Sequence, residues 1–148
     1  MDQDLIAPPR LVIPDTPRDE DRAAILAGLA AFNRDHAAPG STGALAVLLA
    51  DDAGRTIGGL WGRTLFSWLQ IELLFVPEQQ RGQAVGSAVL RRAEALALAR
   101  GCIGASLDTY SFQARGFYEK LGYSLVGTIT DCPPGGARHF LHKRFAPA

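Results

Sequence analysis

This sequence has few cysteines, no excess of charge of one sign and no long apolar runs. Lysine and arginine together number 15, as do aspartate and glutamate, so the formal net charge is zero. Proteins that bind duplex nucleic acid usually carry a basic excess, and the balanced charge argues against such a partner. No apolar run approaches the roughly 18 residues that a membrane-spanning helix needs, which argues against a membrane protein.

The two cysteines, Cys102 and Cys132, do not have the spacing of a CxxC motif. Their small number favours free thiols and a cytoplasmic location. The acidic start, Met1-Asp2-Gln3-Asp4, lacks the basic and apolar parts of a signal peptide, which agrees with that location.

The chain has the length and composition of a globular domain. Hydrophobic residues make up 47% and charged residues 20% of the 148 positions, as in ordinary soluble globular proteins. A chain of this length buries roughly 68–70% of its unfolded surface and supports a hydrophobic core. We therefore expect a lead-in at residues 1–9 and a single domain at residues 10–148.

The spacing of apolar residues predicts an α+β fold in the order β-α-β-β-β-α-β-α-β-β. Strands are expected at residues 11–13, 44–50, 56–64, 68–76, 103–107, 124–130 and 139–145. Three helices are expected. The first begins at Thr16 and Pro17, the second continues from Ser87 to Arg100, and the third follows Ser111, which caps it. The helix between the strands at 68–76 and 103–107 predicts one parallel crossover in a mixed, mostly antiparallel central sheet flanked by helices.

Residues 79–87 join a nearly all-apolar strand to a helix and have the features of an anion site. Gly82 and Gly86 let the backbone approach a ligand without a Cβ in the way. The first turn of the following helix leaves N–H groups unpaired, and the helix dipole makes that end positive. A phosphate is the natural guest there, and Arg81 adds a guanidinium that can fork onto its oxygens.

Two common nucleotide-binding loops do not fit this segment. A P-loop needs a lysine and then serine or threonine after its second glycine, whereas Gly86 is followed by Ser87 and Ala88. A Rossmann fingerprint needs three spaced glycines, whereas alanine occupies position 84 between Gly82 and Gly86. The segment is therefore neither a P-loop nor a Rossmann loop.

Two stretches of sequence carry a family resemblance. The first reads Gln79-Gln80-Arg81-Gly82-Gln83-Ala84, and the second reads Phe117-Tyr118-Glu119-Lys120-Leu121-Gly122-Tyr123. The first resembles the Gln/Arg-x-x-Gly-x-Gly/Ala pyrophosphate loop of the GNAT superfamily of N-acetyltransferases. The second resembles that superfamily's late Tyr-Glu-Lys-Leu-Gly-aromatic signature. With the matching order of elements, the resemblance covers about residues 10–146 and implies the GNAT acyltransferase fold.

The resemblance implies that the chain uses acetyl-CoA as a co-substrate. The end of the strand at 68–76 would lend main-chain groups to the pantetheine arm, and the loop amides would hold the pyrophosphate. The residues expected to contact the cofactor are Leu74, Phe75, Val76, Arg81, Gly82, Gln83, Ala84, Val85, Gly86, Ser87, Ser111, Phe117 and Tyr118. Ser111 stands where the family often has asparagine, so a pantetheine contact and a plain helix cap are both open to it.

Tyr118 is the residue that the resemblance assigns to the departing thiol. A tyrosine has a pKa near 10 and a cysteine-like thiol one near 8.5, so full proton transfer to the thiolate is uphill by roughly 2 kcal/mol. We therefore expect Tyr118 to donate a hydrogen bond that stabilises negative charge developing on sulfur. The residue also lies on an apolar helical stripe, so packing in the core is the alternative.

The attacking amine needs a base, because deprotonating a lysine-like amine at pH 7 costs roughly 4–5 kcal/mol. Glu72, on the strand beside the expected acetyl group, is the first candidate, acting directly or through water. Asp108, at the end of the next strand, is the second, and a structural ion pair is the alternative role for Glu72. The three histidines, His36, His139 and His142, are isolated, so we expect no metal site.

The acceptor is expected to be a primary amine of a small molecule, attacked directly in a ternary complex, with a protein amine as the alternative. By resemblance, its site is built from residues 33–41, 61–68 and 131–139, whose aromatic side chains could equally be core or dimer contacts. A CoA-sensing domain without turnover is a competing function, and a longer acyl donor is also open. The resemblance implies a homodimer, whereas neither nucleic acid nor a membrane is an expected partner.

Overall fold

The computed structural model describes residues 7–37 and 40–146. They belong to two units, Met1–Ala37 and Ala38–Ala148, and each unit is described by itself. The acidic start at residues 1–4 and residues 38–39 of the segment expected at the acceptor site lie outside the described residues. In the described ranges, no helix combines the length and apolarity needed to cross a membrane. The expectation of one domain over residues 10–148 stays a prediction.

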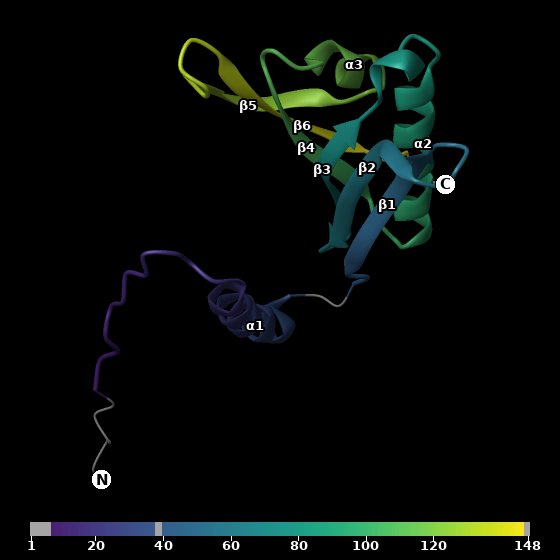
Figure 1. Cartoon of the computed structure of the whole chain (residues 1–148). Helices are drawn as coiled ribbons and strands as arrows, with labels where there is room; N and C mark the ends of the chain where they lie inside the picture. The colour runs from purple at the N-terminus through teal and green to yellow at the C-terminus, as the bar shows by residue number, and fades with distance from the viewer. Residues whose placement is uncertain (1–6, 38–39, 147–148) are drawn as a thin grey trace. The chain divides into compact units, whose positions relative to one another are not determined.

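The first unit contains the helix α1 (Asp19–His36), shown in dark blue in Figure 1. Acidic residues fill its first turn, where their negative charge interacts favourably with the positive end of the helix dipole. The predicted start at Thr16 and Pro17 is wrong, because the helix begins after Arg18 and no side chain caps it.

The strand predicted at residues 11–13 is also wrong. This segment forms no strand, and Leu11 and Ile13 are 97% and 94% exposed. A strand is held by the N–H and C=O groups of a neighbouring strand. Three apolar residues do not supply that neighbour, so the apolar pattern alone overestimated the order of this segment.

The second unit is built on a six-stranded sheet with the order β1-β2-β3-β4-β6-β5 (Figure 1). Neighbouring strands are antiparallel except β3 and β4, which run parallel. The strands are β1 (Gly43–Ala50), β2 (Thr56–Leu65), β3 (Trp68–Phe75), β4 (Gly104–Tyr110), β5 (Ser124–Thr130) and β6 (Ala137–Arg144). The helices are the short 3-10 turn η1 (Glu78–Gln80), α2 (Val85–Ala99) and α3 (Arg115–Lys120). The predicted α+β fold with a mixed, mostly antiparallel sheet is confirmed, and residues 7–37 and 40–146 contain six of the seven predicted strands.

Two elements have bounds that differ from the prediction in a way that matters for the site. β4 continues past the predicted end at Leu107 to Tyr110, so that Asp108 lies within the strand. Pairing with β6 along the whole of β4 explains the extra length. Ser111 does not cap α3, because its Oγ accepts a hydrogen bond from the Ala137 backbone N–H at 3.0 Å.

Helix α2 lies along one face of this sheet and forms the hydrophobic core with it (Figure 1). The side chains that are no more than 2% exposed are Leu45, Leu60, Thr64, Leu69, Leu90, Ala93, Ala97, Cys102, Ala105 and Leu141. Full burial of a leucine side chain stabilises the fold by roughly 1.5–3 kcal/mol. This face of the sheet is therefore occupied by the protein itself.

On β4 the other face of the sheet carries polar and aromatic side chains, and this face is referred to as the polar face. Successive strand residues point to opposite sides of a sheet. In β4 the buried Leu107 and Thr109 accordingly alternate with the more exposed Ser106, Asp108 and Tyr110. The polar face is thus the side from which β4 offers charged and aromatic groups.

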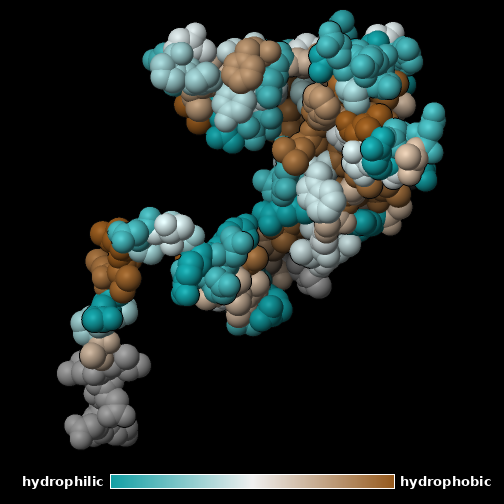
Figure 2. Space-filling view, in the orientation of Figure 1, coloured by the Kyte–Doolittle hydropathy of each residue, from teal (hydrophilic) through white to brown (hydrophobic). Residues whose placement is uncertain are grey.

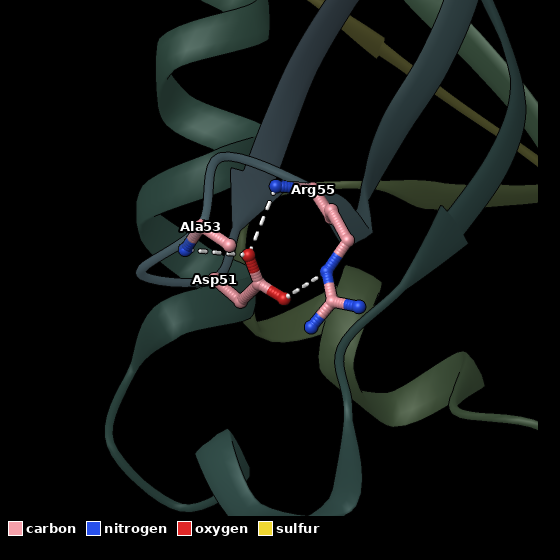
Figure 3. A network of polar contacts seen from close by, with 3 residues as sticks. All are labelled: Asp51, Ala53 and Arg55. Atoms are coloured by element: carbon pink, nitrogen blue, oxygen red, sulfur yellow. Dashed lines mark hydrogen bonds and ion pairs between the residues drawn. The ribbon is translucent and has the colours of Figure 1, made fainter.

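A tight turn fixed by Asp51 joins β1 to β2 (Figure 3). One carboxylate oxygen accepts hydrogen bonds from the backbone N–H groups of Arg55 and Ala53, and the other accepts one from Arg55 Nε, all at 2.9 Å. These donors, the Arg55 N–H above all, lower the pKa of Asp51. Their stabilising effect is present at neutral pH and is lost only as the pH falls through that lowered value. The strands predicted at residues 44–50 and 56–64 are thus joined as an antiparallel hairpin.

Leu90→Ala is expected to lower the free energy of unfolding by about 2–5 kcal/mol, because it leaves a cavity where a fully buried side chain stood. Leu98→Ala on the same helix is the matched control, since Leu98 is 45% exposed, and it should change stability by only about 0.5 kcal/mol. Urea denaturation followed by tryptophan fluorescence measures both variants. Equal losses would contradict the assignment of the Leu90 side of α2 to the core.

Candidate active site

A cleft opens where β3 and β4 separate. Their parallel register runs only from Trp68↔Gly104 to Gln70↔Ser106. Beyond that point, a cleft of about 850 Å³ is lined by the two strand ends, the loop before α2 and residues of α3. In Figure 2, hydrophobic surface gathers on the second unit where Figure 1 shows the end of β3 near α3.

The loop between β3 and α2 presents backbone N–H groups to this cleft. Gly82 and Ala84 have left-handed φ angles of 79° and 59°, and α2 starts at Val85. The Ala88 N–H makes the first bond of the helix, to the Ala84 carbonyl at 3.1 Å, so the N–H groups of residues 85–87 have no acceptor within the helix. The first turn contains no acidic residue. These features fit a phosphate group.

Arg81 braces the loop against the end of β3. Its Nε donates a hydrogen bond to the Val76 carbonyl at 2.9 Å, and its guanidinium carbon lies 5.9 Å from the centre of the Phe75 ring. That bond uses one of the five N–H donors of a guanidinium. Arg81 therefore shapes the loop and also adds positive charge beside the N–H groups of α2.

Gln80 contributes a buried polar atom that sequence reasoning did not single out. The residue lines the cleft, and its Oε1 is buried without a hydrogen-bond partner among the described residues. A buried acceptor left unpaired costs about 1–3 kcal/mol, so a ligand that brings a donor would be favoured. Acetyl-CoA carries amide and hydroxyl donors as well as phosphates. Gln80 Oε1 and the N–H groups at the start of α2 therefore both fit acetyl-CoA.

Tyr118 reaches the cleft from α3. Its ring packs edge-on against two other rings, with centroids 5.1 Å from Phe117 and 5.9 Å from Tyr123. Burial raises the pKa of the Tyr118 phenol, so the hydroxyl stays protonated at neutral pH and can donate a hydrogen bond. The residue thus packs against the core and lines the cleft at once. The Tyr123 hydroxyl, by contrast, already donates to Glu94 Oε2 at 3.2 Å.

Glu72 and Asp108 line the cleft from β3 and β4, and each is paired with an arginine. Arg138 Nε lies 2.8 Å from Asp108 Oδ2, with 35% and 34% of the two side chains exposed. Arg63 Nε lies farther from Glu72 Oε1, at 3.6 Å, with 46% and 43% exposed, and it also donates to Gln70 Oε1 at 3.1 Å. The Glu72 carboxylate is therefore held less tightly by its arginine than the Asp108 carboxylate.

The structure brings most of the predicted cofactor contacts together in the cleft. Those that line it are Leu74, Phe75, Val76, Arg81, Gly82, Ala84, Val85, Gly86, Ser87, Phe117 and Tyr118. Gln83 and Ser111 are not among the lining residues. Gln83 is exposed on the loop, and Ser111 is engaged by the Ala137 N–H. What each lining residue binds stays a prediction.

Sequence reasoning also missed Thr109, Phe112 and Gln113, which line the cleft at the end of β4 and in the turn that follows it. Gln113 Oε1 accepts hydrogen bonds from Thr109 Oγ1 at 3.1 Å and from the Tyr110 N–H at 2.9 Å, which closes the end of β4. The family frame drew attention to position 111 instead. A glutamine three residues after the last residue of a strand is a signal that could have identified the turn.

The aromatic residues weighed for the acceptor pocket, Trp61, Phe66 and Trp68, are not among the residues that line the cleft. Trp61 and Phe66 are 47% and 48% exposed, and the Trp68 ring packs edge-on at 6.3 Å from His142. Over the described ranges, no group of three or more His, Cys, Asp or Glu side chains is placed to hold a metal ion.

Comparison with known proteins agrees with this geometry. Residues 10–123 match the model of the Acetyltransferase (GNAT) family. The chain therefore belongs to this family and is an acetyl-transferring enzyme. A relative, blasticidin-S acetyltransferase of Streptomyces morookaense, is 44% identical over 93 residues, which cover 62% of this chain and 68% of that protein.

Solved structures support the same fold. An acetyltransferase from Bacillus cereus is 30% identical with a TM-score of 0.79, covering 91% of this chain and 98% of its own. An aminoglycoside 6'-N-acetyltransferase complexed with coenzyme A is similar in fold alone, at 18% identity and a TM-score of 0.60, over 71% of this chain and 74% of that one. A neighbour with this fold thus binds coenzyme A.

Gly86→Glu is expected to weaken acetyl-CoA binding at least about 100-fold, because a carboxylate at the start of α2 repels the phosphates there. A Cβ at position 86 would lie 3.3 Å from the Phe117 ring, within the cleft wall. Gly127→Glu is the charge-matched control, since a Cβ there meets no atom within 4 Å. Calorimetric titration with acetyl-CoA measures both, and circular dichroism checks the fold. Unchanged affinity in the Gly86 variant would contradict the phosphate site.

Proposed function

We propose that this chain is an N-acetyltransferase that moves the acetyl group of acetyl-CoA to a primary amine of a small molecule. The observation that carries the proposal is the continuous cleft between β3 and β4. Its lining includes the start of α2 as well as Glu72, Asp108 and Tyr118. A phosphate-bearing donor and an amine acceptor can therefore meet in one site, which supports direct transfer in a ternary complex.

The donor side would use the backbone of β3. Because β3 pairs with β4 only up to Gln70, the β4-facing N–H and C=O groups near the end of β3 have no partner on β4 and can hold an extended ligand. The Val76 carbonyl is the exception, since it already accepts a hydrogen bond from Arg81 Nε. The pantetheine arm, with its two amides, suits such an added strand. Acetyl-CoA, once bound, supplies the acetyl group as a thioester.

The acceptor amine must lose a proton as it attacks the thioester carbonyl, and Glu72 is the better placed of the two acids to take it. Asp108 is tied to Arg138 at 2.8 Å, whereas Glu72 is 3.6 Å from Arg63. Moving a proton onto Asp108 would weaken the closer of these ion pairs. Glu72 can accept the proton directly or through a water molecule, as expected of a general base.

The departing sulfur needs a donor, and Tyr118 supports that role. Its pKa is raised by burial, so the hydroxyl keeps its proton over the pH range of ordinary assays. A hydrogen bond from this hydroxyl would stabilise the charge that develops as the carbon–sulfur bond breaks. The proton on the product thiol can then come from solvent.

A small-molecule acceptor is favoured by the relative named for blasticidin-S, with 44% identity over 93 residues. The test is a panel of small primary amines, incubated with enzyme and acetyl-CoA and read by release of free thiol and by mass spectrometry of the product. Thiol release with at least one amine is expected. Acetyl-CoA binding without thiol release from any amine would contradict catalysis and favour a CoA sensor. Acetylation of peptides alone would contradict the small-molecule acceptor.

Two further expectations belong to the proposal. The homodimer is checked by size-exclusion chromatography with light scattering. A longer acyl donor is checked by competition with propionyl-CoA and succinyl-CoA. The cytoplasmic location stays a prediction from the sequence.

Tyr118→Phe is expected to lower kcat about 10- to 100-fold and to leave KM for acetyl-CoA nearly unchanged, because the ring is kept and the hydroxyl is lost. Since the pKa of Tyr118 is raised, its ionisation would reduce the wild-type kcat only at a pH above the usual tyrosine range, and no such fall is expected at pH 7–9. Tyr123→Phe removes a hydroxyl that does not line the cleft and is the control. Wild-type turnover in the Tyr118 variant would rule out the role.

Glu72→Gln is expected to reduce kcat/KM at pH 7 by about 10²- to 10⁴-fold, because general base catalysis is lost. The loss should shrink as the pH rises toward the pKa of the amine, where the acceptor deprotonates in solution. Asp108→Asn is the comparison, and its loss should not diminish with pH. A pH-dependent recovery in the Asp108 variant alone would assign the base to Asp108.

A further inference from the structure

Four side chains form a continuous stack on the polar face beside the cleft. The guanidinium carbon of Arg138 lies 4.9 Å from the centre of the Phe140 ring and 5.9 Å from the centre of the Tyr110 ring. The Tyr110 ring is in turn stacked on Phe112, with centroids 5.5 Å apart and an interplanar angle of 4°. These residues, Phe140, Arg138, Tyr110 and Phe112, are referred to as the aromatic ladder.

The aromatic ladder is held in place by the sheet. Tyr110 on β4 pairs with Arg138 on β6, and Asp108 pairs with Phe140. Asp108 Oδ2 accepts a hydrogen bond from Arg138 Nε at 2.8 Å, which fixes the guanidinium between the two rings. Cation–π contacts and parallel stacking favour this arrangement. The ladder is therefore formed before any ligand arrives.

Phe112 is the open end of the ladder. Its side chain is 72% exposed although one side of its ring is covered by Tyr110, and it also lines the cleft. A large apolar ring held at the edge of a ligand cleft, with a free face, is suited to stack on a flat group of a ligand. Neither the proton transfer to Glu72 nor the hydrogen bond from Tyr118 uses it.

We propose that Phe112 is a stacking platform for a planar aromatic or heteroaromatic group of the acceptor, so that the enzyme prefers amines that carry such a ring. The inference rests on the proposed function and names its substrate class. The ladder lies on the polar face with Asp108, whereas the phosphate-binding amides belong to α2, which covers the other face. This separation favours the acceptor, rather than the adenine of the cofactor, as the group that stacks on Phe112.

The test compares 2-phenylethylamine with 2-cyclohexylethylamine, which have the same chain length and similar apolar bulk but differ in planarity. Phe112→Leu keeps an apolar side chain and removes the ring, while Phe112→Tyr keeps the ring and is the matched control. The wild type should have the lower KM for 2-phenylethylamine. Phe112→Leu should raise that KM about three- to tenfold and leave the KM for 2-cyclohexylethylamine and acetyl-CoA unchanged. Phe112→Tyr should behave as the wild type.

Several outcomes would overturn the platform. Equal KM values of the wild type for the two amines would do so, as would an equal change for both amines in Phe112→Leu. A rise in the KM for acetyl-CoA, but not for S-acetylpantetheine, would assign Phe112 to the adenine and also overturn it. Thiol release with other amines but no preference for rings would leave the proposed function intact. Absence of thiol release with every amine would refute the proposed function, and the platform with it.

Discussion

The short parallel pairing of β3 with β4 is the constraint on which the rest of the site depends. Each strand is tied to its other neighbour well past the point of separation, β3 to β2 as far as Phe75 and β4 to β6 as far as Tyr110. The gap between them therefore cannot close by pairing. At the joined end, Gly104 allows the close approach, since a Cβ there would lie 2.5 Å from the Trp68 ring and 2.6 Å from the Lys143 carbonyl oxygen. One fixed junction thus sets both the position and the width of the cleft.

The sheet separates stability from chemistry by its two faces. The face covered by α2 contains the leucines and alanines that are almost wholly enclosed, and it anchors the helix whose first turn meets the cleft. The polar face carries acids that are each neutralised by an arginine, Glu72 by Arg63 and Asp108 by Arg138. Each pair places one negative and one positive charge at the cleft, so the pair has no net charge. The whole chain likewise has a formal net charge of zero.

Sequence reasoning reached the fold and most of the cleft lining because these depend on local patterns. The glycine-bearing loop before α2 and the stretch around Tyr118 are marked by residue type alone, and the run from Trp68 to Phe75 by its apolarity. The errors have non-local causes. Residues 11–13 have strand-like composition but no pairing strand, and Ser111 is engaged by Ala137 at the start of β6, 26 residues away along the chain. The stack of Phe112 on Tyr110 and Arg138 joins side chains from two strands and a loop, which no spacing along the chain reveals.

The left-handed conformation of Ala84, with φ of 59°, has a consequence beyond the shape of the loop. An alanine held there is roughly 1–2 kcal/mol less favourable than in the right-handed region, so the surrounding contacts must stabilise it. A ligand that binds only the folded loop adds to that stabilisation, by about 2.7 kcal/mol when its concentration is 100 times its Kd. Resistance to unfolding, and with it resistance to proteolysis, would then increase with the concentration of acetyl-CoA. The lifetime of the enzyme would be linked in this way to the supply of its own acetyl donor.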